Sequence, residues 1–279
     1  SGRADWWHPT LLGQSLDEAA WLPYWLGAWA IRALPFLDPV LASRVPLAGA
    51  LSLSLVATWY SAFSLALQPW AQPLRFAFGG HAEPVAYARA IADTALLVLV
   101  ACLGLAIMGH ESSPHPYAMA ATAVLLHVAA DAQRAERSLS RLRLGLRWAL
   151  ATAALMASGY PGTGWALGLL ALLPRALSAY APAHAPAPHQ WAWRIAAAMG
   201  LSLAYILVPW PHDALSEAPW RAVHLWATLK TAIWYAWPAW PLAMLGLWAW
   251  RRQWRSAHVM LPVLVTGVAL GVAWSAAGP

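Results

Sequence analysis

The sequence predicts an all-α fold, a polytopic transmembrane helical bundle with about eight spans and one interfacial helix near the N-terminus. Of its 279 residues, 61% are hydrophobic and only 10% are charged, whereas soluble domains carry about 25% charged residues. Leu- and Ala-rich apolar runs long enough to cross a bilayer recur along the chain. These runs are continuous and do not alternate between apolar and polar residues, which favours helices over strands.

We expect one transmembrane domain built from an N-terminal segment and two helical groups. Residues 1–44 are expected to form an outer-face segment with an aromatic interfacial helix over 18–35. Residues 45–179 are expected to form a first bundle, with spans over 45–68, 84–109, 117–132, 144–158 and 165–179. The Pro/Ala-rich stretch 180–190 predicts an extended linker. Residues 191–279 predict a second group, with spans over 191–208, 232–250 and 258–276.

The arginines orient these spans. Five arginines fall within residues 134–147, and cytoplasmic loops are enriched in Arg and Lys. Counting spans from that cluster places three acidic segments on the opposite, outer face. They lie at residues 17–18, 110–111 and 212–217.

Composition also excludes several classes of function. The net charge of +6 is explained by Arg-rich cytoplasmic loops, and no basic run interleaved with aromatic residues indicates a nucleic-acid partner. The single cysteine, Cys102, rules out an intrachain disulfide or a thiolate metal cluster. Nucleotide-binding glycine motifs and a GxSxG motif are absent. No His and carboxylate spacing matches a strong metal signature, so we expect no cofactor. A divalent metal held by His and carboxylate ligands is the alternative.

The acidic pair Asp17-Glu18 stands just ahead of a Trp-rich helix that includes Trp21 and Trp25. Acidic residues favour helix N-termini, so the pair can serve as a helix cap. Acidic residues at the mouth of a membrane segment also indicate functional sites. A carboxylate half-buried against indole rings would be a better general base.

Other outer-face residues extend this candidate site. His110 and His115 flank Glu111, and His212 and Asp213 form a further polar cluster. Arg44, Arg221 and Lys230 are the cations best placed to meet a lipid phosphate, although each can also be a snorkelling interfacial residue. Arg89 and Asp93, four residues apart in one predicted span, are expected to pair for packing.

Several short stretches carry a resemblance to a known family. The residues Asp17-Glu18-Ala19, then Leu22-Pro23-Tyr24-Trp25-Leu26-Gly27-Ala28, then Ala42-Ser43-Arg44-Val45-Pro46, resemble the first outer loop of the C-type membrane glycosyltransferases. The branch of the aminoarabinose lipid A transferases and protein O-mannosyltransferases is the most similar. Further stretches at residues 78–80, 87–90 and 235–242 look like a proteobacterial glycosyltransferase-like subgroup.

The resemblance implies transfer of a sugar from a polyprenyl-phosphate donor to a lipid, glycan or protein acceptor, at the periplasmic face of a bacterial inner membrane. Asp17 matches the family's proposed catalytic base, Glu18 is its neighbour, and Glu111 matches a further functional acid. The chain departs from the family by lacking a helix before the acidic motif and most of the C-terminal half. We therefore expect a truncated, compact or inactive member, and we expect a partner chain to supply the missing helices.

Two other readings remain open. The first is a non-catalytic membrane subunit or cofactor-binding scaffold, for which His127 is the clearest mid-span ligand. The second is a transporter or flippase, for which broken helices at mid-membrane depth would be the sign. Pro238 and Pro241 interrupt one predicted span in this way.

Overall fold

The computed structural model describes residues 10–11, 14–15, 20–73, 80, 82–109, 113–132, 138–172, 188–208 and 222–276. The prediction of an all-α fold is confirmed, because within these residues the only strands are two-residue segments. These are β1 (Thr10–Leu11) and β2 (Gln14–Ser15), which pair antiparallel.

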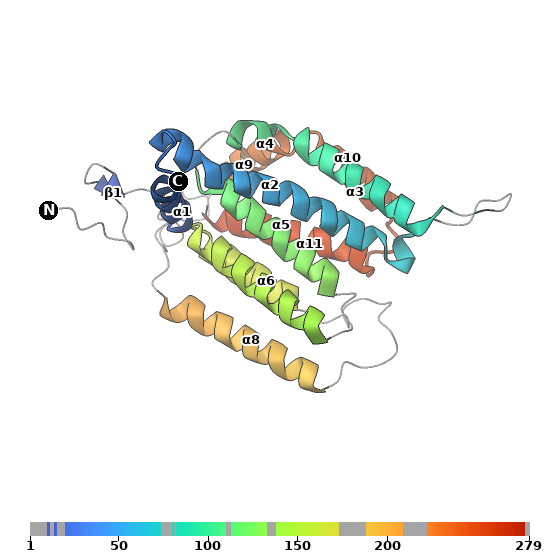
Figure 1. Ribbon diagram of the computed structural model, residues 1–279. Helices are drawn as coiled ribbons and strands as arrows, with labels where there is room; N and C mark the ends of the chain where they lie inside the picture. The colour runs from blue at the N-terminus through green and yellow to red at the C-terminus, as the bar shows by residue number, and fades with distance from the viewer. Residues whose placement is uncertain are drawn as a thin grey trace.

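The described helices form a bundle in which α2 and α5 lie side by side, flanked by α6, with α8 and α3 toward opposite edges (Figure 1). α11 packs against α7 and α5. The helices are α1 (Leu22–Ala33), α2 (Pro39–Ala66), the 3-10 turn η1 (Pro69–Ala71), α3 (Pro84–Val100), α4 (Leu103–Met108), α5 (His115–Ala132), α6 (Ser138–Ala157), α7 (Pro161–Leu172), α8 (Pro188–Leu207), α9 (Ala222–Tyr235), α10 (Ala239–Ala249) and α11 (Ala257–Ala276).

Several predicted boundaries are wrong: α1 covers Leu22–Ala33 instead of 18–35, α6 begins at Ser138 instead of 144, and α7 begins at Pro161 instead of 165. Two further errors have a clear local reason. α2 begins at Pro39, six residues before the predicted Val45, because the Asp38 carboxylate accepts hydrogen bonds from the Val40 and Leu41 amides at 2.9 and 3.4 Å. Proline at the first helical position fits this start. The predicted extended linker is wrong at its end, because α8 already begins at Pro188, where proline again occupies a helix start.

Two predicted continuous spans are broken. The span over 84–109 divides into α3 and α4 at residues 101–102, and the span over 232–250 divides between α9 and α10. The second break contains Pro238, which has no backbone N–H to continue a helix. The two breaks touch, because the Leu103 amide of the first donates a hydrogen bond to the Trp237 carbonyl of the second at 3.1 Å.

Small residues fill the centre of the bundle. On α2, buried Ala50, Ser54, Ala57, Ser61 and Ser64 follow spacings of four and three residues, which is one helical face. The hydroxyls of Ser54 and Ser61 donate back to the carbonyls four residues earlier, at 2.9 and 2.6 Å. Facing them, α5 buries four further alanines, Ala120, Ala121, Ala129 and Ala130.

Large apolar side chains instead cover much of the outside. Exposed examples are Leu142, Leu146 and Leu150 on α6, Ile195, Met199 and Leu203 on α8, and Met244, Leu245 and Trp248 on α10. One described helix, α2, is long and apolar enough by length and composition to cross a membrane, and only 22% of its most apolar window is buried.

A polar cluster lies at the end of the bundle where α5 finishes. The Asp131 carboxylate is 3.8 Å from both His127 Nε2 and an Arg147 guanidinium nitrogen. Ser64 donates a hydrogen bond to the same carboxylate at 3.5 Å. The predicted Arg89–Asp93 ion pair is not formed among the described side chains. Asp93 instead accepts a hydrogen bond from the Trp59 indole at 2.8 Å.

Candidate functional site

Seven of the predicted site residues lie outside the described part of the chain, so their positions stay predictions. They are Asp17, Glu18, His110, Glu111, His212, Asp213 and Arg221. The described chain resumes at Ala20 after the first pair and at Ser113 after the second. The residues that follow these two points can be placed in the bundle.

The chain after Asp17-Glu18 is anchored to the turn between α6 and α7. The amide of Trp21, whose side chain is buried, donates a hydrogen bond to the Ala157 carbonyl at 2.8 Å. One turn later the Trp25 ring stacks on Trp21, with centroids 5.9 Å apart and an interplanar angle of 11°. The two predicted Trp residues therefore form one indole stack at the start of α1.

His115 comes to the same turn from the start of α5. Its Nδ1 is hydrogen-bonded to the Tyr160 hydroxyl, and the two rings are 6.1 Å apart. Tyr160 follows Gly159, which has a positive φ of 89° and reverses the chain between α6 and α7. The structure thus brings together the chain segments that follow both predicted acidic motifs.

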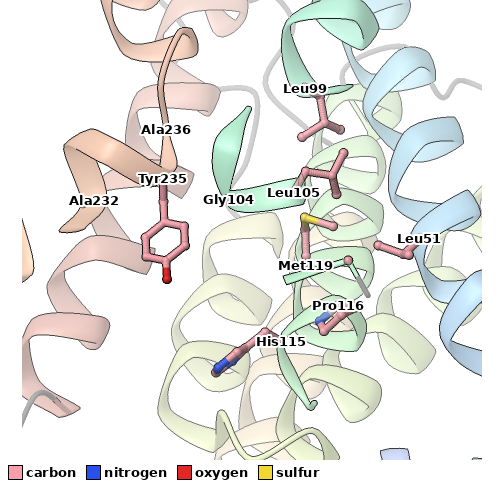
Figure 2. Close-up of a pocket in the computed structure, with 11 residues that line it drawn as sticks. Leu51, Leu99, Gly104, Leu105, His115, Pro116, Met119, Ala232, Tyr235 and Ala236 are labelled. Atoms are coloured by element: carbon pink, nitrogen blue, oxygen red, sulfur yellow. The ribbon is translucent and has the colours of Figure 1, made fainter. Parts of the chain in front are cut away.

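An apolar cavity, which we call the inner pocket, opens beside His115. It has a volume of about 430 Å³ and is lined from α2, α3, α4, α5 and α9, with Leu51, Leu99, Leu105, Met119 and Ala232 among its walls. Figure 2 shows the Tyr235 hydroxyl turned toward the end of the pocket where His115 lies, with Leu99 at the other end. The pocket is therefore apolar along its length and polar at one end.

A second hollow, the outer groove, lies between α4 and α9 and shares Tyr235 with the inner pocket. It has a volume of about 500 Å³ and is lined by Leu103, Ile107, Lys230, Thr231, Trp234 and Tyr235. Lys230 is exposed and is the only lysine of the chain. It is also the only Asp, Glu, Lys or Arg residue between positions 221 and 251. A cation isolated in an apolar helix beside a groove is suited to an anionic group.

Arg44, the remaining predicted contact, is exposed near the start of α2 and lines neither the inner pocket nor the outer groove. Nothing in its described surroundings assigns it to the site, and its phosphate-binding role stays a prediction.

The inner pocket depends on the contact between the two helix breaks. A Cβ atom added at Gly104 of α4 would lie 2.9 Å from the Tyr235 carbonyl oxygen and 3.1 Å from the Tyr235 Cβ. Only a residue without a side chain fits there, so Gly104 allows α4 to lie directly against α9.

Sequence reasoning missed three residues of this site: Tyr160, Tyr235 and Gly104. Tyr160 lies between the predicted spans 144–158 and 165–179, and Tyr235 begins the stretch 235–242 noted for the family resemblance. Their roles come from contacts with residues far away in the chain, which local patterns do not report. Gly104 carried no signal beyond being a glycine within an apolar run.

In the part of the chain that the structure describes, no three His, Cys, Asp or Glu side chains gather as a metal site would require. No family model, curated protein or solved structure matches this chain. The inner pocket and its polar end are therefore the features of the molecule that indicate a function.

Proposed function

We propose that the chain is an integral, polytopic membrane protein that transfers a sugar from a polyprenyl-phosphate donor to an acceptor. In this proposal the transfer takes place at the end of the bundle where His115 lies, on the periplasmic side of a bacterial inner membrane. The observation that carries it is the inner pocket, a cavity with apolar walls that has His115 and the Tyr235 hydroxyl toward one end. His115 is in turn hydrogen-bonded to Tyr160.

The distribution of side chains supports membrane insertion. In lipid, burying apolar side chains gives no drive for helices to associate, so transmembrane helices pack through small residues and expose large apolar ones. The buried Ala and Ser face of α2 and the exposed Leu, Ile and Met of α6 and α8 follow this arrangement. Hydroxyls that donate within their own helix leave no donor unsatisfied in such surroundings.

The chemistry assigned to the site is a displacement at the anomeric carbon of the donor. Asp17 accepts the proton of an acceptor hydroxyl, whose oxygen then forms a bond to that carbon. The bond from the carbon to the phosphate oxygen breaks, and the lipid phosphate leaves with the electron pair. The apolar tail occupies the inner pocket or the adjoining outer groove, and the Lys230 ammonium attracts the phosphate.

The test is sugar transfer by purified protein in detergent, with radiolabelled polyprenyl-phosphate sugars as donors and a membrane extract as acceptor. Asp17→Asn keeps the size of the side chain but removes the base, so transfer should fall by about 100-fold or more while thermal stability is unchanged. Asp131→Asn, a carboxylate at the other end of α5, should keep transfer. If the wild-type protein transfers no sugar and Asp17→Asn is less stable than the wild type, Asp17 is a helix cap and the proposal is contradicted.

Tyr160→Phe tests the polar end separately, since it removes the hydroxyl that bonds His115 and keeps the ring. We expect transfer to fall about tenfold or more, because His115 loses the group that orients it. Stability should fall by only about 1 kcal/mol, the usual net worth of one hydrogen bond. Unchanged transfer would remove the His115–Tyr160 pair from the mechanism.

One observation favours a second candidate, a lipid transporter or flippase. Discontinuous helices that meet at mid-membrane depth are a common feature of transporters. The breaks after α3 and α9 meet at Leu103 and Trp237 beside both hollows. Movement of a fluorescent lipid between leaflets of proteoliposomes, without any sugar transfer, would favour this candidate.

A further inference from the structure

The outward face of α3 carries a stripe that fits a helix partner. Ala86, Ala90, Asp93, Leu97 and Val100 are all exposed, at spacings of four, three, four and three residues. This spacing keeps all five on one side of a helix and is the seam pattern of two helices that cross at a shallow angle. The buried residues of α3, Ala88 and Ala92, lie on the opposite side.

The outward face of α3 carries one charge in the stripe and one beside it that lipid does not match. Asp93 is exposed near the middle of α3, and one carboxylate oxygen accepts from Trp59. Arg89, one turn before it, is also exposed and has no ion pair among the described residues. Ionisable side chains in transmembrane segments are costly and nearly always face protein, water or each other. A purely apolar lipid surface would leave both charges of this face unmatched.

From these observations we infer that α3 is the interface of a symmetric dimer, in which a second copy of this chain packs its own α3 against this stripe. The inference rests on the proposed insertion in a membrane. Two-fold symmetry about the membrane normal makes the helices parallel and makes one patch contact itself. Each Arg89 then reaches the Asp93 of the other copy, so the patch is complementary in charge to itself.

Steric features of the stripe agree with this partner. Ala86 and Ala90 form a small-xxx-small pair, which lets two transmembrane backbones approach closely. The larger Leu97 and Val100 continue the seam toward the break at residues 101–102. α3 also contacts the rest of the described bundle mainly through α2, and its outward residues are exposed, so this face can receive a partner. α3 lies toward one edge of the bundle (Figure 1).

Cysteine cross-linking combined with charge exchange tests the dimer. In a Cys102→Ala background, which removes the only native thiol, Ala90→Cys is oxidised in carbonate-washed membranes and the disulfide-linked dimer is measured on a gel. Leu150→Cys, on the exposed face of α6, is the matched control. We expect efficient cross-linking at position 90 and little at position 150, because a disulfide requires Cα atoms within about 7 Å.

Charge exchange is then made in the Ala90→Cys protein. Arg89→Asp and Asp93→Arg each place like charges across the seam and should lower the dimer yield about tenfold, as expected for an interfacial charge pair. The double variant restores opposite charges between the copies and should recover the yield. Recovery is not expected if each substitution merely damages folding of α3.

Three results would overturn the inference. Equal cross-linking at positions 90 and 150 would mean random collision, and a double variant that stays low would mean that the charges do not pair between copies. Cross-linking of Ala90→Cys to a different protein would replace the second copy as partner. Loss of the chain from washed membranes would contradict the membrane proposal itself, whereas a retained chain without the cross-link overturns only the dimer.

Discussion

Gly104 is the residue at which the two broken helices touch, and its replacement tests how tightly they are held. In Gly104→Ala the new methyl group would meet the Tyr235 carbonyl at 2.9 Å, so α4 and α9 must separate. We expect a loss of about 1–3 kcal/mol in the free energy of unfolding, the usual cost of overpacking. Thermal or denaturant unfolding in detergent measures it.

Gly145→Ala provides the control, because a Cβ at that α6 position meets nothing within 4 Å. Alanine has the higher helix propensity, so this variant should be unchanged or up to about 1 kcal/mol more stable. Equal effects at the two glycines would mean that α4 does not rest on α9 as described.

At the residue scale the sequence predicted the kinds of side chain better than their partners. His115 and Trp21 were selected by type and by position near span ends, and both contact the chain near the turn between α6 and α7. Tyr160 could not be paired with His115 in advance, because 45 residues separate them and no local period relates them. The same limit applies to Asp93, which was expected to pair along its own helix and instead bonds Trp59 on α2.

At the element scale the α2–α5 interface depends on small side chains, and two serines of α2 make a matched test. Ser61 is buried, and its hydroxyl lies 2.6 Å from the Ala57 carbonyl and 3.5 Å from the Ala123 carbonyl on α5. Ser61→Leu adds volume where two backbones meet, so we expect destabilisation by about 1–3 kcal/mol or failure to fold.

Ser52 is exposed on the same helix and makes the same kind of bond, to the Ala48 carbonyl at 2.8 Å. Ser52→Leu should change the free energy of unfolding by only about 0.5 kcal/mol, as is usual for surface positions. Both variants are compared by unfolding in detergent. A tolerated Ser61→Leu would show that α2 and α5 are not in close contact at this point.

Local signals mark several element boundaries, but the predicted spans followed only some of them. Gly159 lies at the predicted turn after α6, whereas proline lies at the break before α10 and at the start of α8, where a continuous span and a linker were predicted. The break after α3 has no proline and was missed. It coincides with the hydrogen bond from Leu103 to Trp237, a tertiary contact that a single sequence does not encode in any local pattern.

At the scale of the whole molecule, the central question is which solvent surrounds the bundle. Composition predicted a membrane protein, and the all-α class predicted with it is confirmed. The insertion itself is a proposal supported by where the apolar side chains lie. Large apolar groups outside and small ones between helices are costly in water and favourable in lipid. The effect of a charged substitution on the outer surface therefore distinguishes a bundle surrounded by water from one surrounded by lipid.

Met199 lies near the middle of the proposed span on α8 and is 68% exposed. In water Met199→Lys would be nearly neutral, but in the centre of a bilayer a lysine costs about 2.5–3.5 kcal/mol. We therefore expect this variant to lose stability or membrane retention. The control is Trp254→Lys, which also replaces an exposed apolar side chain by lysine. Trp254 is 52% exposed in the Arg-rich turn before α11. This variant should stay in the membrane, because charged side chains are favoured at that interface. Retention after carbonate washing measures both, and equal retention with equal stability would mean that no lipid covers α8.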